Sequence, residues 1–409
     1  MHPTPAVVCT DGAGINALAT VRSLGRRGVP VHVVSVADSP QIASDSRYCA
    51  SHTRVAERVA LFGALRQLSQ RLGHRPVLYV DNDAMMQLLA PRADALAQHF
   101  QVVDPLADAA RLTDKAFQLR VAREAAVAVP RTWFPGNWLE LNEIGRQTAK
   151  RLIIKPSPRQ TARTAAFKVA VCASARELAA LLRRLGASPD EVLVQEYVEG
   201  DDAQIYVGLC YRAGNQRCFI MSAKKLRQTQ PGAGVMAVGQ AVDAPAVRDL
   251  TRSLAEALGL RGVICTEFKL DPTDGRLYFI EWNPRPAYFQ SLGWQAGFDL
   301  AYLAYCDHVA AERLPLTESS CAASHYWINS GGDLQHLAMA PGLVLRPATW
   351  APYLRTKEWA VFAPDDPRPW ARSAARFATA LPRALTRRLA ARYAPRSSAR
   401  PALPPSSAG

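Results

Sequence analysis

Two apolar stretches near residue 270 each contain a glutamate that a buried strand does not need. Glu267 lies within residues 263–270, and Glu281 lies within FIEWNPRP at residues 279–286. The sequence DPTDG separates the two stretches, so the pattern predicts a β-hairpin. Strand alternation places Asn283 on the same face as Glu281. Two carboxylates and one carboxamide on a single face form a set of oxygen ligands that suits Mg²⁺.

The connection also predicts how the two strands pair. If the ends of DPTDG close the turn, Glu267 lies opposite Phe279 and Cys265 lies opposite Glu281. Glu267, Phe279, Glu281 and Asn283 then share one face of the hairpin. In this register the two glutamates are diagonal neighbours, roughly 7 to 8 Å apart between backbones.

Buried carboxylates at these positions need a partner. An unpaired buried carboxylate is costly, so each glutamate requires a cation or must stay protonated. The alternative is that this face of the sheet is exposed to water and that the glutamates pair with Lys269 or Arg276. The hairpin considered by itself leaves both interpretations open.

Two lysines lie at the boundaries of other predicted elements. Lys155 closes the apolar run LIIK, and Lys115 follows Thr113 and Asp114 at the start of a predicted helix over residues 111–129. Thr113 is the expected N-cap of that helix, with Asp114 in its first turn. Considered by itself, each lysine favours the interpretation of an ordinary surface residue over a functional one.

The elements around these residues fall into two kinds. Residues 6–103 alternate short apolar runs with segments of helical period, which predicts a parallel Rossmann-like sheet. Such sheets bind ligands at the carboxyl ends of their strands, here residues 10–14 and 81–83. DGAG at residues 11–14 is not a complete dinucleotide-binding glycine pattern, so a plain tight turn and a ligand contact both remain open. From residue 203 to 282 strands dominate, and one helix is expected near residues 245–259.

Composition excludes several classes of protein. The chain has 409 residues, of which 49% are hydrophobic, with a formal charge of +14. From Arg368 onward there are nine arginines and no acidic residue, which leaves 40 basic and 35 acidic groups, or +5, in residues 1–367. The positive charge therefore belongs to the tail, and specific nucleic-acid binding by the folded body is not expected. Eight scattered cysteines and the absence of a signal-peptide pattern favour free thiols and a cytoplasmic location.

Four motifs in order resemble those of the ATP-grasp superfamily, and in particular its carboxylate-amine ligase branch. They are TDK at 113–115, IIKP at 153–156, VQEYVEGDD at 194–202, and EFKLD with FIEWNPR between 267 and 285. The resemblance covers residues 5–312. It implies a Rossmann-like pre-domain followed by an ATP-grasp fold of two α+β lobes that clamp a nucleotide, with a basic C-terminal extension.

The resemblance implies roles for individual residues. Lys115 and Lys155 contact the α and β phosphates of ATP, and Glu267, Glu281 and Asn283 hold two Mg²⁺ ions, for which Mn²⁺ can substitute. Arg285, Arg227 and Lys155 are the catalytic candidates, because cations stabilise the substrate carboxylate and the transferred phosphoryl group. The remaining nucleotide contacts implied are Gln195 and the backbone of Glu196 and Val198 at adenine, Asp202 at ribose, and Lys168.

One departure concerns the loop after IIKP. The family places glycines there, whose backbone amides cover the terminal phosphates. Residues 157–166 contain no glycine, so either Arg159, Arg163 and the hydroxyl groups replace the amides or turnover is weak. The expected reaction activates a carboxylate as an acylphosphate, releases ADP and joins the acyl group to an amine. The rivals are an ATP-binding scaffold without turnover, a nicotinamide enzyme, and a nucleic-acid or membrane-binding protein that acts through the tail.

The expected domain limits follow from these motifs. They are a pre-domain at 1–110, an N-terminal lobe at 111–200, a C-terminal lobe with the metal site at 201–315, an accessory segment at 316–366 and a partly disordered tail at 367–409. Small carboxylates and amines are the expected partners, weak membrane-surface contact through residues 368–400 is an option, and the chain is expected to be a monomer or a homodimer.

Overall fold

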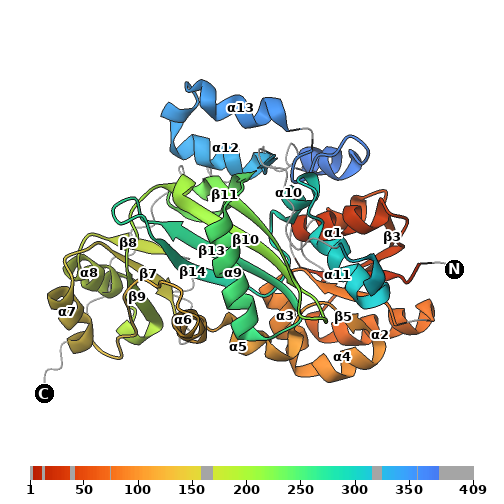
Figure 1. Cartoon of the computed structure of the whole chain (residues 1–409), viewed down its shortest axis with the longest axis horizontal. Helices are drawn as coiled ribbons and strands as arrows, with labels where there is room; N and C mark the ends of the chain where they lie inside the picture. The colour runs from red at the N-terminus through yellow and green to blue at the C-terminus, as the bar shows by residue number, and fades with distance from the viewer. Residues whose placement is uncertain are drawn as a thin grey trace, which may run out of the picture.

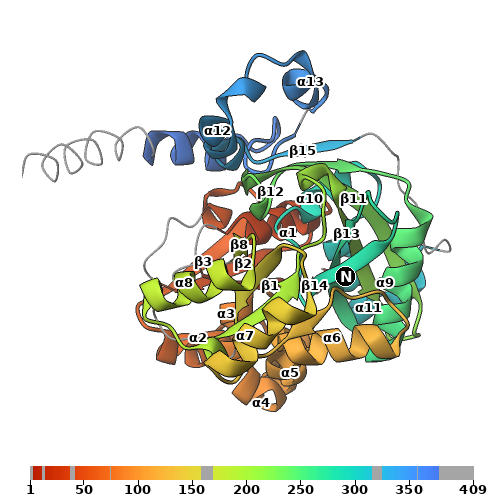
Figure 2. The same cartoon turned by 90° about the vertical axis from the view of Figure 1, so that its left-hand side faces the viewer.

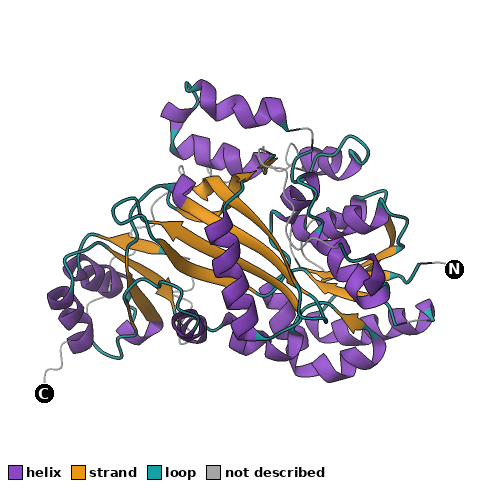
Figure 3. Cartoon of the chain, in the orientation of Figure 1, coloured by secondary structure: helices purple, strands orange, loops and turns teal. Residues whose placement is uncertain are grey.

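A computed structural model describes residues 3–11, 14–36, 42–73, 75–157, 169–315, 325–356 and 358–376 of the chain. In these residues the strands form three sheets, which Figure 1 shows side by side in one elongated molecule. Figure 3 shows helices packed around all three sheets. The combination of one parallel sheet with two antiparallel sheets confirms the predicted α/β and α+β class.

The first sheet is parallel and has the strand order β3-β2-β1-β4-β5. The inner strands β1, β2 and β4 consist mainly of apolar residues, as expected where helices cover both faces, whereas the edge strand β3 is polar and largely exposed. The strands are β1 (Ala6–Thr10), β2 (Val31–Val36), β3 (Cys49–Val55), β4 (Val77–Val80) and β5 (Gln101–Val102). The helices that follow them are α1 (Ile15–Gly25), α2 (Leu61–Leu72), α3 (Asp83–Leu89) and α4 (Ala93–His99).

A four-stranded sheet of order β6-β9-β7-β8 forms the second unit. Two amphipathic helices bury their apolar faces against it, with Leu141 and Leu178 completely enclosed. The strands are β6 (Thr132–Trp133), β7 (Leu152–Pro156), β8 (Ala170–Cys172) and β9 (Val192–Glu196), and the helices are α7 (Trp138–Gln147) and α8 (Ala175–Leu185). The segment between β7 and β8, with Arg159, Arg163 and Lys168, lies outside the described residues.

The third sheet has six antiparallel strands in the order β14-β13-β10-β11-β12-β15. Its strands are β10 (Ile205–Arg212), β11 (Cys218–Gln230), β12 (Ala233–Ala241), β13 (Gly262–Leu270), β14 (Leu277–Asn283) and β15 (Tyr326–Ile328). Helix α9 (Pro245–Leu258) covers one face, and α10 (Gln290–Gln295) and α11 (Leu300–Val309) connect the other face to the first sheet. One apolar core, which includes Val8, Leu18 and Leu209, joins the first and third sheets.

Helices α12 (Ser330–Met339) and α13 (Pro347–Arg355) form an outer layer beyond β11, β12 and β15. Figure 2 shows this layer at the top of the molecule, away from the first sheet. The described chain also contains short 3-10 helices at Ala43–Asp45, Arg58–Ala60, Ala90–Arg92, Leu106–Asp108, Pro189–Glu191, Asp202–Gln204, Ala311–Arg313 and Pro341–Leu343.

The helix predicted over residues 111–129 is interrupted at Asp114. It forms two helices, α5 (Ala109–Thr113) and α6 (Lys115–Glu124). The carboxylate of Asp114 accepts a hydrogen bond from the Phe117 N–H at 2.7 Å, whereas the Thr113 hydroxyl donates to the Ala109 carbonyl at 2.9 Å. Asp114 is therefore the N-cap, and the prediction of Thr113 was wrong by one residue. This cap starts a new helix at Lys115 and fixes where its side chain leaves the backbone.

Candidate active site

A cavity of about 660 Å³ lies between the four-stranded and six-stranded sheets. We call it the central cavity. Its walls come from β7 and β9 on one side, from β11, β13 and β14 on the other, and from the start of α3 in the first unit. The charged side chains that line it are Asp83, Lys115, Lys155, Glu196, Lys225, Glu267, Lys269, Glu281 and Arg285.

The predicted hairpin is present, but its register differs from the prediction. Leu270 pairs with Leu277, and a bulge beside Phe268 changes the pairing so that Glu267 lies directly opposite Glu281. The extra residue is Ile280, which lets both Ile280 and Glu281 line the cavity. Phe279, predicted to share the face of the glutamates, is instead fully buried in the opposite core against Phe268.

Glu281 is held ionised by two lysines. The Lys115 ammonium donates to Glu281 Oε2 at 2.6 Å. Burial acts to raise the pKa of Glu281, but the positive charges of Lys115 and Lys155 outweigh it and hold the pKa at about 2. The carboxylate is therefore available as an anionic ligand at any physiological pH.

Lys155 experiences the opposite balance. It extends from β7 into the central cavity, where desolvation lowers its pKa to about 8 even though Glu281 and Glu267 favour its charged form. Lys115 adds a repulsive positive charge to the same space. A second anion, such as a phosphate group, would restore the ordinary preference of Lys155 for its proton.

A lysine that the sequence reasoning missed completes the cluster. Lys225 on β11 is 3% exposed and donates to Glu267 Oε2 at 2.8 Å and to Gln228 Oε1 at 3.2 Å. By alternation alone, Lys225 and Arg227 share a face of the strand. Between these two residues, however, β11 contains an irregularity against β12 that turns Arg227 away. The signal in the sequence was the doubled KK of KKLRQ, which gives a cation on each face.

Arg227 is placed in a different environment from its predicted one. Its guanidinium donates to both carboxylate oxygens of Asp333, at 2.6 and 2.9 Å, and to the Thr349 carbonyl at 3.2 Å. Asp333 is completely buried and also accepts from the Tyr353 hydroxyl at 2.7 Å. Arg227 does not line the central cavity and joins β11 to α12 and α13.

Asp202 also lies outside the lining of the central cavity. Its carboxylate accepts hydrogen bonds from the Gln228 backbone N–H at 3.0 Å, the Gln228 side chain at 2.8 Å and the Gly232 N–H at 2.9 Å. These bonds occupy both oxygens and hold the turn between β11 and β12. In this structure Asp202 positions a wall of the cavity, and Gly232 and Gly234 from that turn line it.

Arg285 lies in the cavity wall and is held by Asp83, the first residue of α3. Its guanidinium makes a bidentate pair with Asp83, at 2.8 and 2.9 Å. Asn16 on α1 donates to the carbonyl of the next residue, Pro286, at 3.1 Å, and to the Asp81 carbonyl at 2.9 Å. Residues at the carboxyl ends of the parallel strands thus hold the NPRP segment in place. Gly12 and Ala13 from the same edge lie outside the described residues.

The end of the cavity beside β9 is lined by polar side chains and backbone. Gln195, Glu196 and Val198 line it, and the Gln195 side chain donates to the Thr132 hydroxyl at 2.9 Å. Within the described residues, the Val198 N–H has no backbone acceptor. A second buried lysine, Lys269, donates to the Tyr197 hydroxyl at 3.1 Å and lies 4.2 Å from the centre of its ring.

The donor set on the hairpin fits a hard divalent cation. Glu267 and Glu281 are cross-strand partners, and Asn283 follows on the same side of the cavity. Each carboxylate forms an ion pair with a lysine ammonium group, which provides the cationic partner that a buried carboxylate needs. Over the described residues no group of three His, Cys, Asp or Glu side chains gathers, so a metal there takes remaining ligands from water or substrate.

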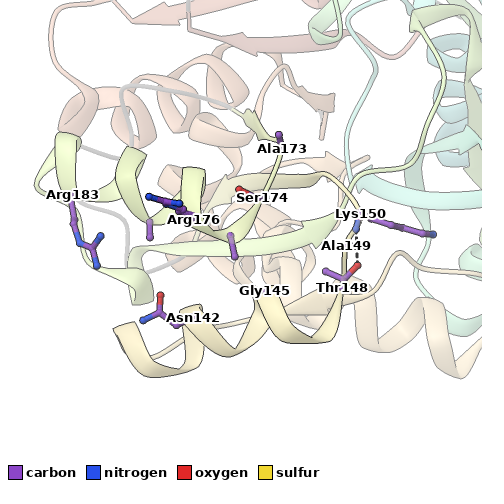
Figure 4. Close-up of a pocket in the computed structure, with 11 residues that line it drawn as sticks. Asn142, Gly145, Thr148, Ala149, Lys150, Ala173, Ser174, Arg176 and Arg183 are labelled. Atoms are coloured by element: carbon purple, nitrogen blue, oxygen red, sulfur yellow. Dashed lines mark hydrogen bonds between the residues drawn. The ribbon is translucent and has the colours of Figure 1, made fainter.

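A second hollow, of about 420 Å³, lies between α7 and α8 on the outside of the second unit. Figure 4 shows Lys150, Arg176 and Arg183 at its rim. It lacks carboxylates and is open to solvent, and none of the residues singled out from the sequence lines it. The clustered chemistry therefore belongs to the central cavity.

The three sheets, with the cavity between the second and third, define the ATP-grasp fold. No family model and no curated relative matches the sequence. Among solved structures, an Aspergillus clavatus N5-carboxyaminoimidazole synthase with ADP and 5-aminoimidazole ribonucleotide is 15% identical, covers 80% of this chain and 81% of that one, and superposes with a TM-score of 0.60. The Staphylococcus aureus N5-carboxyaminoimidazole synthetase with ADP is 14% identical, with 78% and 80% coverage and a TM-score of 0.58.

A biotin carboxylase has the same arrangement. The biotin carboxylase domain of Hydrogenobacter thermophilus 2-oxoglutarate carboxylase, with MgADP and bicarbonate, is 15% identical, covers 80% of this chain and 74% of that one, and has a TM-score of 0.58. These likenesses establish the fold. No helix in the described part of the chain is both long and apolar enough to cross a membrane.

Proposed function

We propose that the protein is an ATP-dependent, ADP-forming ligase that activates a carboxylate as an acylphosphate and joins it to an amine. The observation that carries this proposal is the facing pair Glu267 and Glu281, each bonded to its own lysine, in a cavity whose opposite wall is β7 and β9. Solved structures of similar fold contain ADP or MgADP, which supports nucleotide binding by this chain.

Adenine is the group that fits the end of the cavity beside β9. The Val198 N–H, for which the described residues provide no backbone acceptor, can donate to the base, and Gln195 and Glu196 also line this end of the cavity. Lys115 and Lys155 then face the phosphates, whose charge offsets the repulsion between the two ammonium groups. Glu267, Glu281 and Asn283 would hold two Mg²⁺ ions, or Mn²⁺ in their place, which would neutralise charge on the phosphate oxygens as Lewis acids.

The chemistry has two displacements. An oxygen of the substrate carboxylate attacks the terminal phosphorus of ATP, and the bond to ADP breaks. The amine then attacks the acyl carbon, and phosphate leaves as the amine loses a proton. The protein contributes position and charge: Lys155 and Lys225 face the transferred group, and Arg285 is placed to hold the carboxylate.

In this proposal Lys225 takes the role predicted for Arg227, which is to stabilise the transferred phosphoryl group. Its ammonium is in the cavity, while the Arg227 guanidinium is bound to Asp333. The acid and the amine enter between Arg285 and Asp83 on one side and the turn at Gly232 and Gly234 on the other.

The proposal also covers the location, the domain limits and the oligomeric state of the protein. We place the protein in the cytoplasm, which is supported by free thiols at all seven described cysteines. We keep the domain limits at residues 110, 200, 315 and 366, with the qualification that β15 from the fourth segment pairs with β12 of the third. A monomer or homodimer is the proposed state.

The test is ADP release in the presence of Mg²⁺ and pools of acids and amines. We expect ADP formation that requires both a carboxylate and an amine. Glu281→Gln removes a charged ligand but preserves shape, and we expect at least about a hundredfold loss of kcat. Asp274→Asn, at the exposed turn of the same hairpin, is the control and should retain full activity. ATP binding with no turnover across all pools would instead indicate a scaffold, and full activity of Glu281→Gln would exclude the metal assignment.

A further inference from the structure

Exposed apolar side chains gather on the outer helical layer formed by α12, residues 340–346 and α13. Most large hydrophobic residues that are exposed in the described chain lie there, and Leu345 and Leu354 are 87% and 88% exposed. The other members are Leu334, Met339, Val344 and Trp350. On the surfaces of soluble proteins, exposed apolar residues normally occur singly. Their concentration on one layer therefore indicates an interaction surface.

The outward direction of these side chains is set by the inner face of the layer. Asp333, His336 and Thr349 are buried toward β11, where Arg227 and the Gln228 carbonyl bind them. Trp350 and Leu354 lie one turn apart on α13 and on its solvent side. Figures 1 and 2 show α12 and α13 projecting from the rest of the molecule, so a flat partner can reach them.

Among the described residues of the outer helical layer, the exposed charged side chains are all positive. Arg346 and Arg355 are exposed on the layer. The acidic residues nearby are neutralised: Asp333 is paired with Arg227, and Glu358 is buried and paired with Arg26. The chain that follows continues with nine arginines and no acidic residue from Arg368 onward.

We propose that the outer helical layer docks onto an anionic lipid surface. Leucine, methionine and tryptophan side chains enter the interface between headgroups and acyl chains, and the arginines bind the anionic headgroups. A second copy of the chain fits less well, because a symmetric contact sets the patch against itself and brings arginines of both copies together with no acidic partner. No residue of the outer helical layer lines the central cavity, so the proposed docking surface is separate from it.

Vesicle flotation of the full-length protein tests this proposal. We expect binding to vesicles that contain phosphatidylglycerol, and much weaker binding to phosphatidylcholine alone. Leu345→Ser with Leu354→Ser should weaken binding by at least about tenfold, because two leucine side chains no longer enter the bilayer. Arg346→Glu with Arg355→Glu should have an effect of about the same size on anionic vesicles only.

Two controls separate this layer from other causes. Val59→Ser with Leu139→Ser removes side chains that are 75% and 77% exposed outside the layer, and it should bind vesicles like the wild type. A chain ending at residue 376 should keep the leucine dependence. Loss of all binding on that truncation, unchanged binding of the leucine variant, or a leucine-dependent dimer by light scattering without vesicle binding would each overturn the proposal.

Discussion

The central cavity sets two neighbouring side chains in opposite electrostatic conditions. The ammonium groups of Lys115 and Lys155 hold the pKa of Glu281 at about 2, while burial lowers the pKa of Lys155 to about 8. The protein thus maintains an ionised carboxylate and a cation that is costly without a further anion. That combination suits a site in which a phosphate arrives with the substrate.

Lys155→Met tests the cost of this cation. The pKa of Lys155 in the folded protein, about 8, lies below the ordinary lysine value of 10.5. The charged side chain therefore lowers stability below pH 8, and this penalty disappears as the pH rises to 10.5. We expect Lys155→Met to raise Tm at pH 7, by an amount that shrinks between pH 8 and 10.5, and to abolish ADP release. A gain in Tm that does not change with pH would contradict this electrostatic account.

Lys269 gives a prediction about nucleotide affinity. It is 8% exposed beside Tyr197, and it forms no ion pair with a described carboxylate. Lys269→Met should raise the KM for ATP by about tenfold and leave kcat within about twofold, since it lies at the base end, away from the reacting atoms. Lys224→Met, outside the cavity lining, is the matched control. An equal fall in kcat with unchanged KM would place Lys269 at the chemistry instead.

At the scale of elements, alternation and turn composition predict the hairpin but not its bulge. DPTDG identifies the connection, and the pairing through Leu270 and Leu277 begins close to the expected register. The bulge at Ile280 depends on packing, because Phe279 and Trp282 both fill the core under α6 and α9. A rule with a strict period of two cannot represent two successive residues that face the cavity.

The limits of local sequence patterns also explain why Lys115 and Lys155 line the central cavity and Arg227 does not. Lys115 begins α6 and Lys155 lies near the end of β7, and the structure brings both to the central cavity. Arg227 lies beyond an irregularity in β11, and its partner Asp333 is more than a hundred residues away in the chain. Long-range pairing of this kind has no local signature, so the sequence favoured Arg227 where the structure presents Lys225.

Arg227 therefore carries a prediction about stability. Arg227→Met leaves the completely buried Asp333 without its charge partner, which should lower the free energy of unfolding by about 3 to 5 kcal/mol. Adding Asp333→Leu should recover most of the loss, because no unpaired charge then remains. Chemical denaturation measures both. A single variant with wild-type stability and a large fall in kcat would return Arg227 to a catalytic role.

On the scale of the whole molecule, the chain assembles one cavity from three sheets and fastens the C-terminal segment to the first sheet. Arg22 on α1 pairs with the completely buried Asp366 at 3.0 Å, and Arg26 pairs with Asp365 at 2.7 Å. The Asp83 to Arg285 pair connects the first unit to the end of β14. The pre-domain therefore fixes the wall at which the substrate carboxylate is proposed to bind.

Oxygen transfer from acid to phosphate tests the central claim most directly. The acid identified by the ADP-release assay is labelled with heavy oxygen in its carboxylate, and the phosphate formed in a complete reaction is analysed by mass spectrometry. An acylphosphate route predicts one labelled oxygen in each phosphate released, because the attacking carboxylate oxygen leaves with phosphorus. Unlabelled phosphate, with one labelled oxygen in the amide and the other in water, would contradict it.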